Sequence, residues 1–186
     1  MTDRPRIGSL DAVLALDHPD LLAGPVAEFL RGWAHADRVF VAAIDPELAD
    51  TAAFCAAYDV PPAASANCVV VAGRRGETTT LAACMVLATT RADVNGVVRR
   101  RLDARKASFA PMDVAVAETG MEYGGITPVG LPRSWPLLVD GAVVSAGDVV
   151  IGSGIRGSKL LLPGAALLEL PGAELVDGLA APTAQP

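Results

Sequence analysis

Hydrophobic and polar positions along the chain follow two different periods, which predicts a mixture of strands and helices. Short apolar runs predict strands over residues 38–44, 67–73, 80–88, 105–109, 136–139, 147–152 and 158–162. Helical spacing predicts helices over residues 24–33, 45–58, 93–104, 111–119 and 164–170. The pattern therefore indicates an α/β or α+β fold. The short connections late in the chain favour antiparallel pairing there.

Local signals mark the ends of several predicted helices. Asp45 is expected to cap a helix in which Pro46 takes the first position. Asp93 is a second candidate cap, and Gly120 is expected to end the helix before it. No internal repeat or linker divides the chain, so we expect a single domain over residues 1–180 followed by a disordered tail over 181–186.

Composition excludes several classes of protein. The chain has 186 residues, of which 52% are hydrophobic, yet no run approaches the roughly 20 apolar residues that span a bilayer. The N-terminus lacks the apolar core of a signal peptide. Three cysteines without CxxC spacing argue against a disulfide framework or a zinc site. We therefore expect a cytoplasmic protein with no membrane partner, metal or cofactor.

The charge balance argues against a general binder of DNA or RNA. The net charge is −6, whereas such proteins are usually basic, so any nucleic-acid contact has to rest on a local patch. The candidate patches are Arg74–Arg75, Arg99–Arg101 with Arg105 and Lys106, and Arg156 with Lys159. The alternative is that each of these is a solvated face on an acidic surface.

One glycine motif resembles a dinucleotide fingerprint but lacks its context. Gly152, Gly154 and Gly157 follow a predicted strand with GxGxxG spacing. The fingerprint requires a long helix at its third glycine, whereas here an apolar run follows and Pro163 ends it. A tight hairpin between two strands explains these glycines better.

Common catalytic side chains are scarce. The only histidines, His18 and His35, both lie in the N-terminal fifth of the chain, which disfavours a histidine triad or a multi-histidine metal site. Cys68 has no sequence neighbour that would activate it as a nucleophile.

The segment "YGGITPVGLP" (123–132) offers backbone groups instead of side chains. Gly124 and Gly125 remove the side chains that would cover their amides, and Pro128 stiffens the loop. Backbone amides can stabilise an oxyanion without any titrating side chain. A plain Gly/Pro turn is the alternative interpretation.

From about residue 38 to 179 the sequence resembles the YbaK/ProX family of aminoacyl-tRNA deacylases, which includes the editing domain of some prolyl-tRNA synthetases. The matching segments are "NCVVVAG", "TGMEYGGITPVGLP", "PLLVD" and "VVIGSGIRGSKLLL". The resemblance implies a mixed, largely antiparallel β-sheet, curled toward a barrel and flanked by short helices. It also implies a cleft for an aminoacyl group and the terminal adenosine of tRNA.

The resemblance also implies the function and the site. The expected reaction is trans-editing, the hydrolysis of a mischarged small aminoacyl ester such as Ala- or Cys-tRNA(Pro), with the tRNA acceptor end as the partner. The implied catalytic residues are Gly124, Gly125, Thr127 and Pro128. The implied substrate-binding residues are Asn67, Ile126, Gly152, Ser153, Gly154 and Arg156, with Ser153 and Gly154 nearest the ligand and Arg156 nearer the phosphates.

One position departs from the family pattern. The family typically places a substrate-holding lysine at the start of the central strand, where this chain has Asn67, and neither Lys106 nor Lys159 is near it in sequence. On this basis Asn67→Lys is expected to raise deacylation. The alternative function is a non-catalytic protein that binds a tRNA end or an aminoacyl ligand.

Overall fold

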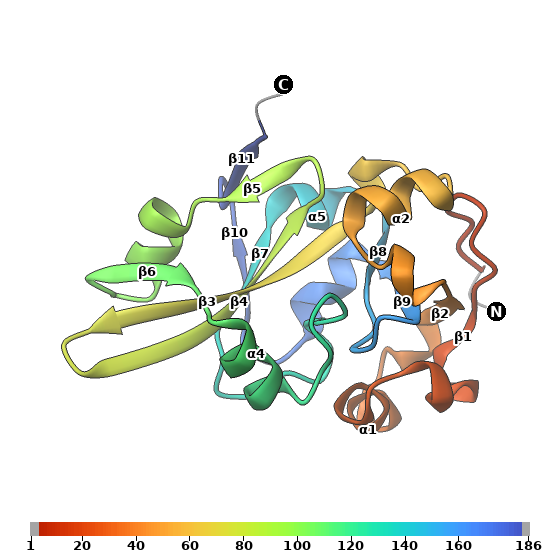
Figure 1. Ribbon diagram of the computed structural model, residues 1–186, viewed down its shortest axis with the longest axis horizontal. Coiled ribbons are helices and arrows are strands. Elements are labelled where there is room, and N and C mark those ends of the chain that lie inside the picture. The colour runs from red at the N-terminus through yellow and green to blue at the C-terminus, as the bar shows by residue number, and fades with distance from the viewer. Residues whose placement is uncertain (1–3, 184–186) are drawn as a thin grey trace.

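The computed structural model describes residues 4–183 as β-sheets with short helices packed around them (Figure 1). The strands are β1 (Val13–Leu14), β2 (Phe40–Ala43), β3 (Ala66–Arg75), β4 (Thr78–Leu87), β5 (Thr90–Ala92), β6 (Lys106–Phe109), β7 (Leu137–Asp140), β8 (Asp148–Gly152), β9 (Ser158–Pro163), β10 (Ala173–Val176) and β11 (Ala180–Pro182). The α-helices are α1 (Gly24–Gly32), α2 (Thr51–Ala57), α3 (Arg99–Arg101), α4 (Met112–Thr119) and α5 (Gly141–Ser145). A π-helix spans Val94–Val98, and 3₁₀ turns span Ala15–Asp17, Pro19–Leu21, Ala36–Arg38, Pro46–Leu48, Pro62–Ala64 and Gly164–Glu169.

The strands form a five-stranded sheet in the order β10-β7-β4-β3-β6, a four-stranded sheet in the order β1-β2-β9-β8, and the pair β11-β5. The expected mixed, largely antiparallel fold is confirmed, although the described strands do not close into a barrel. β8 and β9 form the expected antiparallel hairpin. The expectation of antiparallel pairing late in the chain is wrong for β7, which runs parallel to β4 and β10. Its sheet neighbours are distant in sequence, so short connections do not determine its direction.

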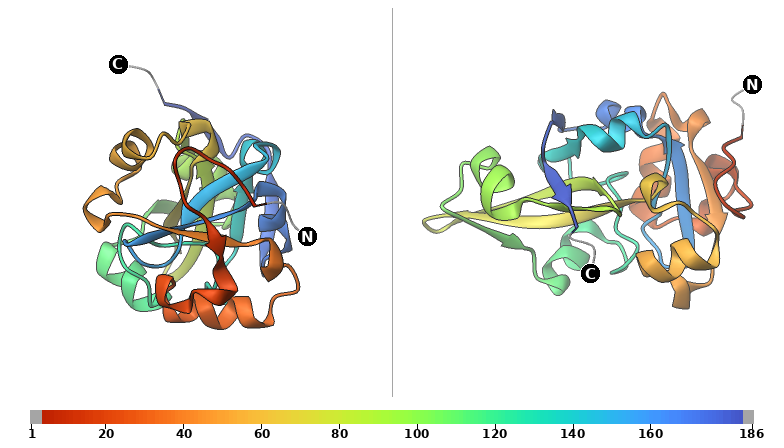
Figure 2. Two further views of the ribbon diagram at one scale, coloured as in Figure 1. Left: turned by 90° about the vertical axis from the view of Figure 1, so that its right-hand side faces the viewer. Right: turned by 90° about the horizontal axis from the view of Figure 1, so that it is seen from above.

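The long hairpin of β3 and β4 links the two larger sheets. Its turn projects from one side of the molecule, as the view from above shows most clearly (Figure 2). At its other end, a β-bridge between Ser65 and Val150 joins the start of β3 to β8. The start of β3 therefore lies at the junction of the two sheets.

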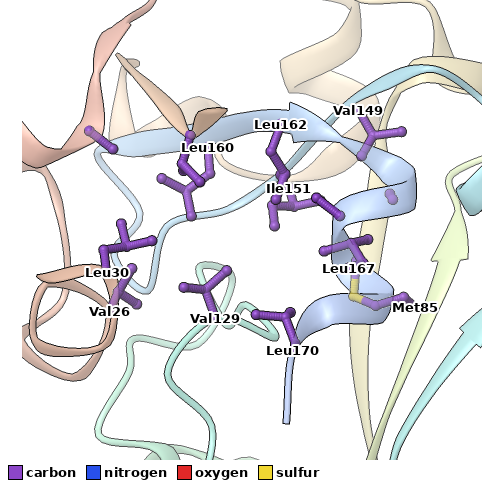
Figure 3. Close-up of a cluster of buried hydrophobic side chains, with 14 of the residues drawn as sticks. Val26, Leu30, Met85, Val129, Val149, Ile151, Leu160, Leu162, Leu167 and Leu170 are labelled. Atoms are coloured by element: carbon purple, nitrogen blue, oxygen red, sulfur yellow. The ribbon is translucent and has the colours of Figure 1, made fainter. Parts of the chain in front are cut away.

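Most of the hydrophobic core lies between α1, the β8–β9 hairpin and the segment over residues 164–170 (Figure 3). Leu160 and Leu162 of β9 belong to this cluster, whereas Leu161 packs with Phe54 of α2 in a second cluster. β9 is therefore buried on both faces. Because side chains alternate along a strand, Lys159 takes the same side of β9 as Leu161.

Capping residues explain where several helices begin and end. Asp45 caps only a 3₁₀ turn, and Asp50 caps α2 by accepting the amides of Ala52 and Ala53, so the predicted helix over 45–58 is divided in two. Asp93 caps the π-helix, and Gly120 ends α4 in a left-handed conformation with φ 66°. Both of these predictions are confirmed.

The sequence patterns did not predict β1, β5, β10, β11 or α5, which are all short. Ala181 and Pro182 belong to β11, which pairs with β5, so the expected disordered tail does not begin at 181. Thr183 follows and donates its amide to the carbonyl oxygen of Thr89 at 3.2 Å, and residues 184–186 lie outside the described residues. The single domain stays a prediction. None of the helices in the described chain has the length and apolar character needed to cross a membrane.

Candidate functional site

A cavity of about 370 Å³ opens where the two larger sheets meet. It is lined by residues 49–51 before and within α2, by residues 65–70 along the start of β3, and by residues 150–152 of β8. Lys159 of β9, residues 109–110 at the end of β6 and Ala115 of α4 add to its wall. The glycine loop after α4, through Tyr123, Gly124 and Ile126, completes it. The fold thus brings segments distant in sequence around one hollow. Of the site residues expected from the sequence, Asn67, Gly124, Ile126 and Gly152 line it.

The glycine loop packs closely against the turn between β8 and β9. The amide of Gly154 donates to the carbonyl oxygen of Gly125 at 2.7 Å, and the amide of Glu122 donates to that of Gly154 at 2.9 Å. A Cβ on Gly125 would lie 2.5 Å from the backbone oxygen of Ile155, and one on Gly152 would lie 2.4 Å from the oxygen of Gly125. Glycine is therefore required at both positions by close backbone contact.

The amides of the glycine loop differ in their availability. The amide of Gly125 donates to the carbonyl oxygen of Glu122 at 2.9 Å, so the expectation that it stays free for a ligand is wrong. The amides of Gly124 and Ile126 donate no hydrogen bond within the part of the chain that the structure describes, and both residues line the cavity. An amide without a protein acceptor remains able to bind an oxyanion.

Four other expected site residues lie behind the cavity wall. Thr127 is fully buried and its hydroxyl finds no partner among the described residues, while Pro128 is buried beside it. Ser153 is also fully buried, and its hydroxyl accepts a hydrogen bond from that of Ser158 at 2.7 Å. A Cβ on Gly154 would meet Ala23 and Val26 at α1. None of the four lines the cavity, so their roles toward a substrate stay predictions.

Arg156 lies at the edge of the site. Its guanidinium donates to the carbonyl oxygen of Pro46 at 2.9 Å and to that of Tyr123 at 3.5 Å. Its amide donates to the carboxylate of Glu122 at 2.7 Å. The side chain therefore connects the turn before α2 with the glycine loop. Its contact with tRNA phosphates stays a prediction.

Asn67 points its amide oxygen toward the start of α2, where it accepts the hydroxyl of Thr51 at 2.9 Å. The next residue, Cys68, also lines the cavity, but burial raises the pKa of its thiol, and the adjacent Cys84 raises it further. A thiol that stays protonated is a poor nucleophile. The environment of Cys68 therefore gives no support for a cysteine nucleophile.

Sequence reasoning placed Lys159 in a candidate surface patch with Arg156 and missed its place in the cavity, so that patch is wrong for Lys159. The residue is only 8% exposed, yet it lines the cavity that Asn67 lines from the other sheet. Its ammonium donates to the carbonyl oxygen of Ala49 at 3.2 Å and lies 5.0 Å from the ring centroid of Phe54. The signal available in the sequence was a single charge within the apolar strand "SKLLL", at a position whose i+2 neighbour is Leu161.

The electrostatic surroundings of Lys159 disfavour its charged form. Burial lowers the pKa of its ammonium because desolvation penalises the charge. Cys55 raises the pKa, Arg156 lowers it, and Asp50 raises it. No carboxylate lies within ion-pair distance of Lys159 in the described structure. The same described region holds no group of three or more His, Cys, Asp or Glu side chains able to bind a metal.

A comparison with models of known protein families finds a match that covers the cavity. A family model of the aminoacyl-tRNA editing domain matches residues 45–170, which include every segment that lines the cavity. No curated protein matches the chain.

Two solved structures share the fold. One, described as a proposed trans-editing enzyme for prolyl tRNA synthetase, is 22% identical, with 83% of this chain and 94% of that chain covered and a TM-score of 0.68. The other, the hypothetical protein APE2540, is 20% identical, with 84% and 99% covered and a TM-score of 0.73. At such identities the similarity establishes the fold alone.

Proposed function

The chain belongs to the aminoacyl-tRNA editing domain family, and on that premise we propose that it deacylates mischarged aminoacyl-tRNA in trans. The observation that carries the proposal is the pair of amides at Gly124 and Ile126, which lack acceptors among the described residues and belong to residues that line the cavity. An ester carbonyl develops negative charge on its oxygen during hydrolysis, and preorganised amides stabilise that charge.

The reaction is a simple hydrolysis. A water oxygen forms a bond to the ester carbonyl carbon, and the bond from that carbon to the ribose oxygen breaks. The ribose oxygen takes up a proton, so that free amino acid and uncharged tRNA are released. The resemblance to the YbaK/ProX family implies that the terminal hydroxyls of the tRNA, or the substrate side chain, assist. This is compatible with a cavity whose described lining contains no histidine and only a poorly ionised thiol.

The cavity favours a small aminoacyl group. Its volume of about 370 Å³ is near the lower end of the range for small-molecule sites, about 300–1,000 Å³. Apolar side chains contribute much of its wall, among them Ala49, Val69, Val70 and Ala115. Alanyl, cysteinyl and seryl esters are therefore the first substrates to test.

Asn67 keeps a second function open. Because it stands where the family has a lysine, the chain could instead bind a tRNA end or an aminoacyl ligand without turnover. Both functions use the same cavity, and only the rate of hydrolysis distinguishes them.

We expect the protein to accelerate deacylation of at least one of alanyl-, cysteinyl- and seryl-tRNA. The measurement is the loss of radiolabelled amino acid from a panel of aminoacyl-tRNAs, compared with spontaneous hydrolysis. Acceleration of at least one member supports the deacylase. Binding of tRNA without acceleration of any member contradicts it and supports the binding protein.

A further inference from the structure

Lys159 is an unusual residue for a buried strand. A lysine is rarely buried without a carboxylate partner, because desolvating the ammonium is costly. Within the described chain its ammonium has one hydrogen-bond acceptor, the carbonyl oxygen of Ala49, although a lysine carries three N–H donors. The face of Phe54 offsets part of the cost of burial. The ammonium therefore retains donors for a ligand in the cavity that Lys159 lines.

The surroundings of Lys159 also connect it to Asn67. Residues 49–51 form one wall of the cavity, with Ala49 accepting from Lys159 and Thr51 donating to Asn67. The two side chains come from different sheets, with Asn67 on β3 and Lys159 on β9, and meet at the same hollow. Asn67 is neutral, so the positively charged side chain at this cavity is Lys159 of β9.

We infer that Lys159 binds the oxygen-rich aminoacyl end of the substrate and supplies the positive charge that Asn67 cannot. This inference rests on the proposed function for the identity of the substrate. The ammonium donates to acceptor oxygens of the ester or the terminal ribose, while the amides of Gly124 and Ile126 face the oxyanion. Charge-assisted hydrogen bonds are stronger than neutral ones, which explains the retention of a costly buried charge.

Substitution of Lys159 provides the first test. Lys159→Met keeps the apolar stem and removes the charge, so it should lower kcat/KM for the best aminoacyl-tRNA by about 10- to 100-fold. Lys159→Arg keeps the charge and should retain more activity than Lys159→Met. Arg31→Met is the control, since Arg31 is exposed on α1 and lines neither the cavity nor any proposed binding surface. Its kcat/KM for the same aminoacyl-tRNA should equal that of wild type.

Thermal unfolding separates a functional role from a structural one. Because the cost of burying an ammonium disappears, Lys159→Met should unfold at the same temperature as wild type or higher. A strongly lowered unfolding temperature, together with unchanged kcat/KM of the folded fraction, would overturn the inference. Wild-type rates in a normally folded Lys159→Met would overturn it equally.

The wild-type protein gives a second test that needs no variant. Labelling with ε-¹³C lysine yields signals from only Lys106 and Lys159. Adding 3′-deoxy-3′-(L-alanylamino)adenosine, in which an amide replaces the ester, should shift the Lys159 signal and leave that of Lys106 in place. An unshifted Lys159 signal at saturation would overturn the inference. A shift in a protein that hydrolyses no ester would support it while contradicting the deacylase function.

A different observation, a basic hollow beside β6, carries an independent inference. Arg74, Arg99, Arg105 and Lys106 line a hollow of about 550 Å³ to which no acidic side chain of the described residues contributes. Arg74 and Lys106 lie directly opposite each other on β3 and β6, an arrangement of like charges that normally destabilises a sheet. The neighbouring Arg75 and Arg101, by contrast, are ion-paired with Asp103 and Glu174.

The hollow and the cavity both border β6. Lys106 lines the hollow and Phe109, at the other end of the same strand, lines the cavity, a separation of about 10 Å along the strand. Phe109 and Tyr123 line the cavity with 51% and 58% of their surface exposed, and exposed aromatic rings are platforms for base stacking. We propose that this hollow binds phosphates of the tRNA acceptor strand, given the proposed function.

Salt dependence tests this second proposal. The double variant Arg105→Ala/Lys106→Ala should weaken tRNA binding and reduce the slope of log K against log salt by about one unit for each phosphate that the variant no longer neutralises. Arg31→Ala, which removes an exposed arginine from α1, is the control and should leave the slope unchanged. Hydrolysis of the minimal ester 3′-O-alanyladenosine should be unaffected in all of these proteins. An unchanged slope in the double variant, or equal reductions in activity with the minimal ester, would overturn the proposal.

Discussion

Gly125→Ala should lower the rate of deacylation by about 100-fold, the scale expected when catalytic groups are displaced by about 1 Å. Its new Cβ would lie 2.5 and 2.6 Å from the backbone oxygen and carbon of Ile155, and neither atom belongs to a flexible side chain. The glycine loop and the β8–β9 turn would have to separate, which would move the amides of Gly124 and Ile126. We also expect the free energy of unfolding to fall by about 1–3 kcal/mol, as for other overpacked sites. Single-turnover kinetics and denaturant unfolding measure the two effects.

A glycine in the β8–β9 turn, against which the glycine loop packs, provides the control. A Cβ on Gly157 would have no heavy atom within 4 Å, and the backbone there is not left-handed. Gly157→Ala should therefore change the free energy of unfolding by less than about 0.5 kcal/mol and leave turnover unchanged. If Gly125→Ala leaves the deacylation rate and the free energy of unfolding as unchanged as Gly157→Ala does, the close packing of the glycine loop against the β8–β9 turn does not hold the catalytic amides in place.

The sequence was most informative where structure is local. Asp93 and Gly120 act through neighbouring residues, and both were predicted correctly from sequence. The glycines at 152, 154 and 157 were correctly assigned to a hairpin, because the apolar run after them cannot form the required helix. Strands such as β1 and β5 have only two and three residues, too few to show a period.

The candidate site was predicted only in part, for a physical reason. The loop over 123–132 was recognised because Gly and Pro restrict or free the backbone in ways that can be read from the residue type alone. The sequence could not show which amides are free, because that depends on hydrogen bonds within the folded loop. There the amide of Gly125 donates to the carbonyl oxygen of Glu122. It also could not show that Lys159 and Asn67 line the same cavity, because the two lie in different sheets and the cavity forms only where those sheets join.

Asn67→Lys should lower deacylation, the opposite of what the sequence alone suggests. The new ammonium would share a cavity of about 370 Å³ with Lys159. For an assumed separation of about 8 Å and an effective dielectric constant of about 20, two such charges repel by about 2 kcal/mol, equivalent to a factor of about 30 in an equilibrium constant. The substitution also removes the acceptor of the Thr51 hydroxyl. The measurement is kcat/KM with the best aminoacyl-tRNA.

The paired variant Asn67→Lys/Lys159→Asn distinguishes repulsion from damage to the site. It restores a single ammonium to the cavity, now delivered from β3, so it should recover activity relative to Asn67→Lys alone and relative to Lys159→Asn alone. Such recovery is a coupling between two residues that simple destabilisation does not produce. If Asn67→Lys alone raises kcat/KM above that of wild type, a lysine on β3 is what the site lacks, and Lys159 is not its substrate-binding cation.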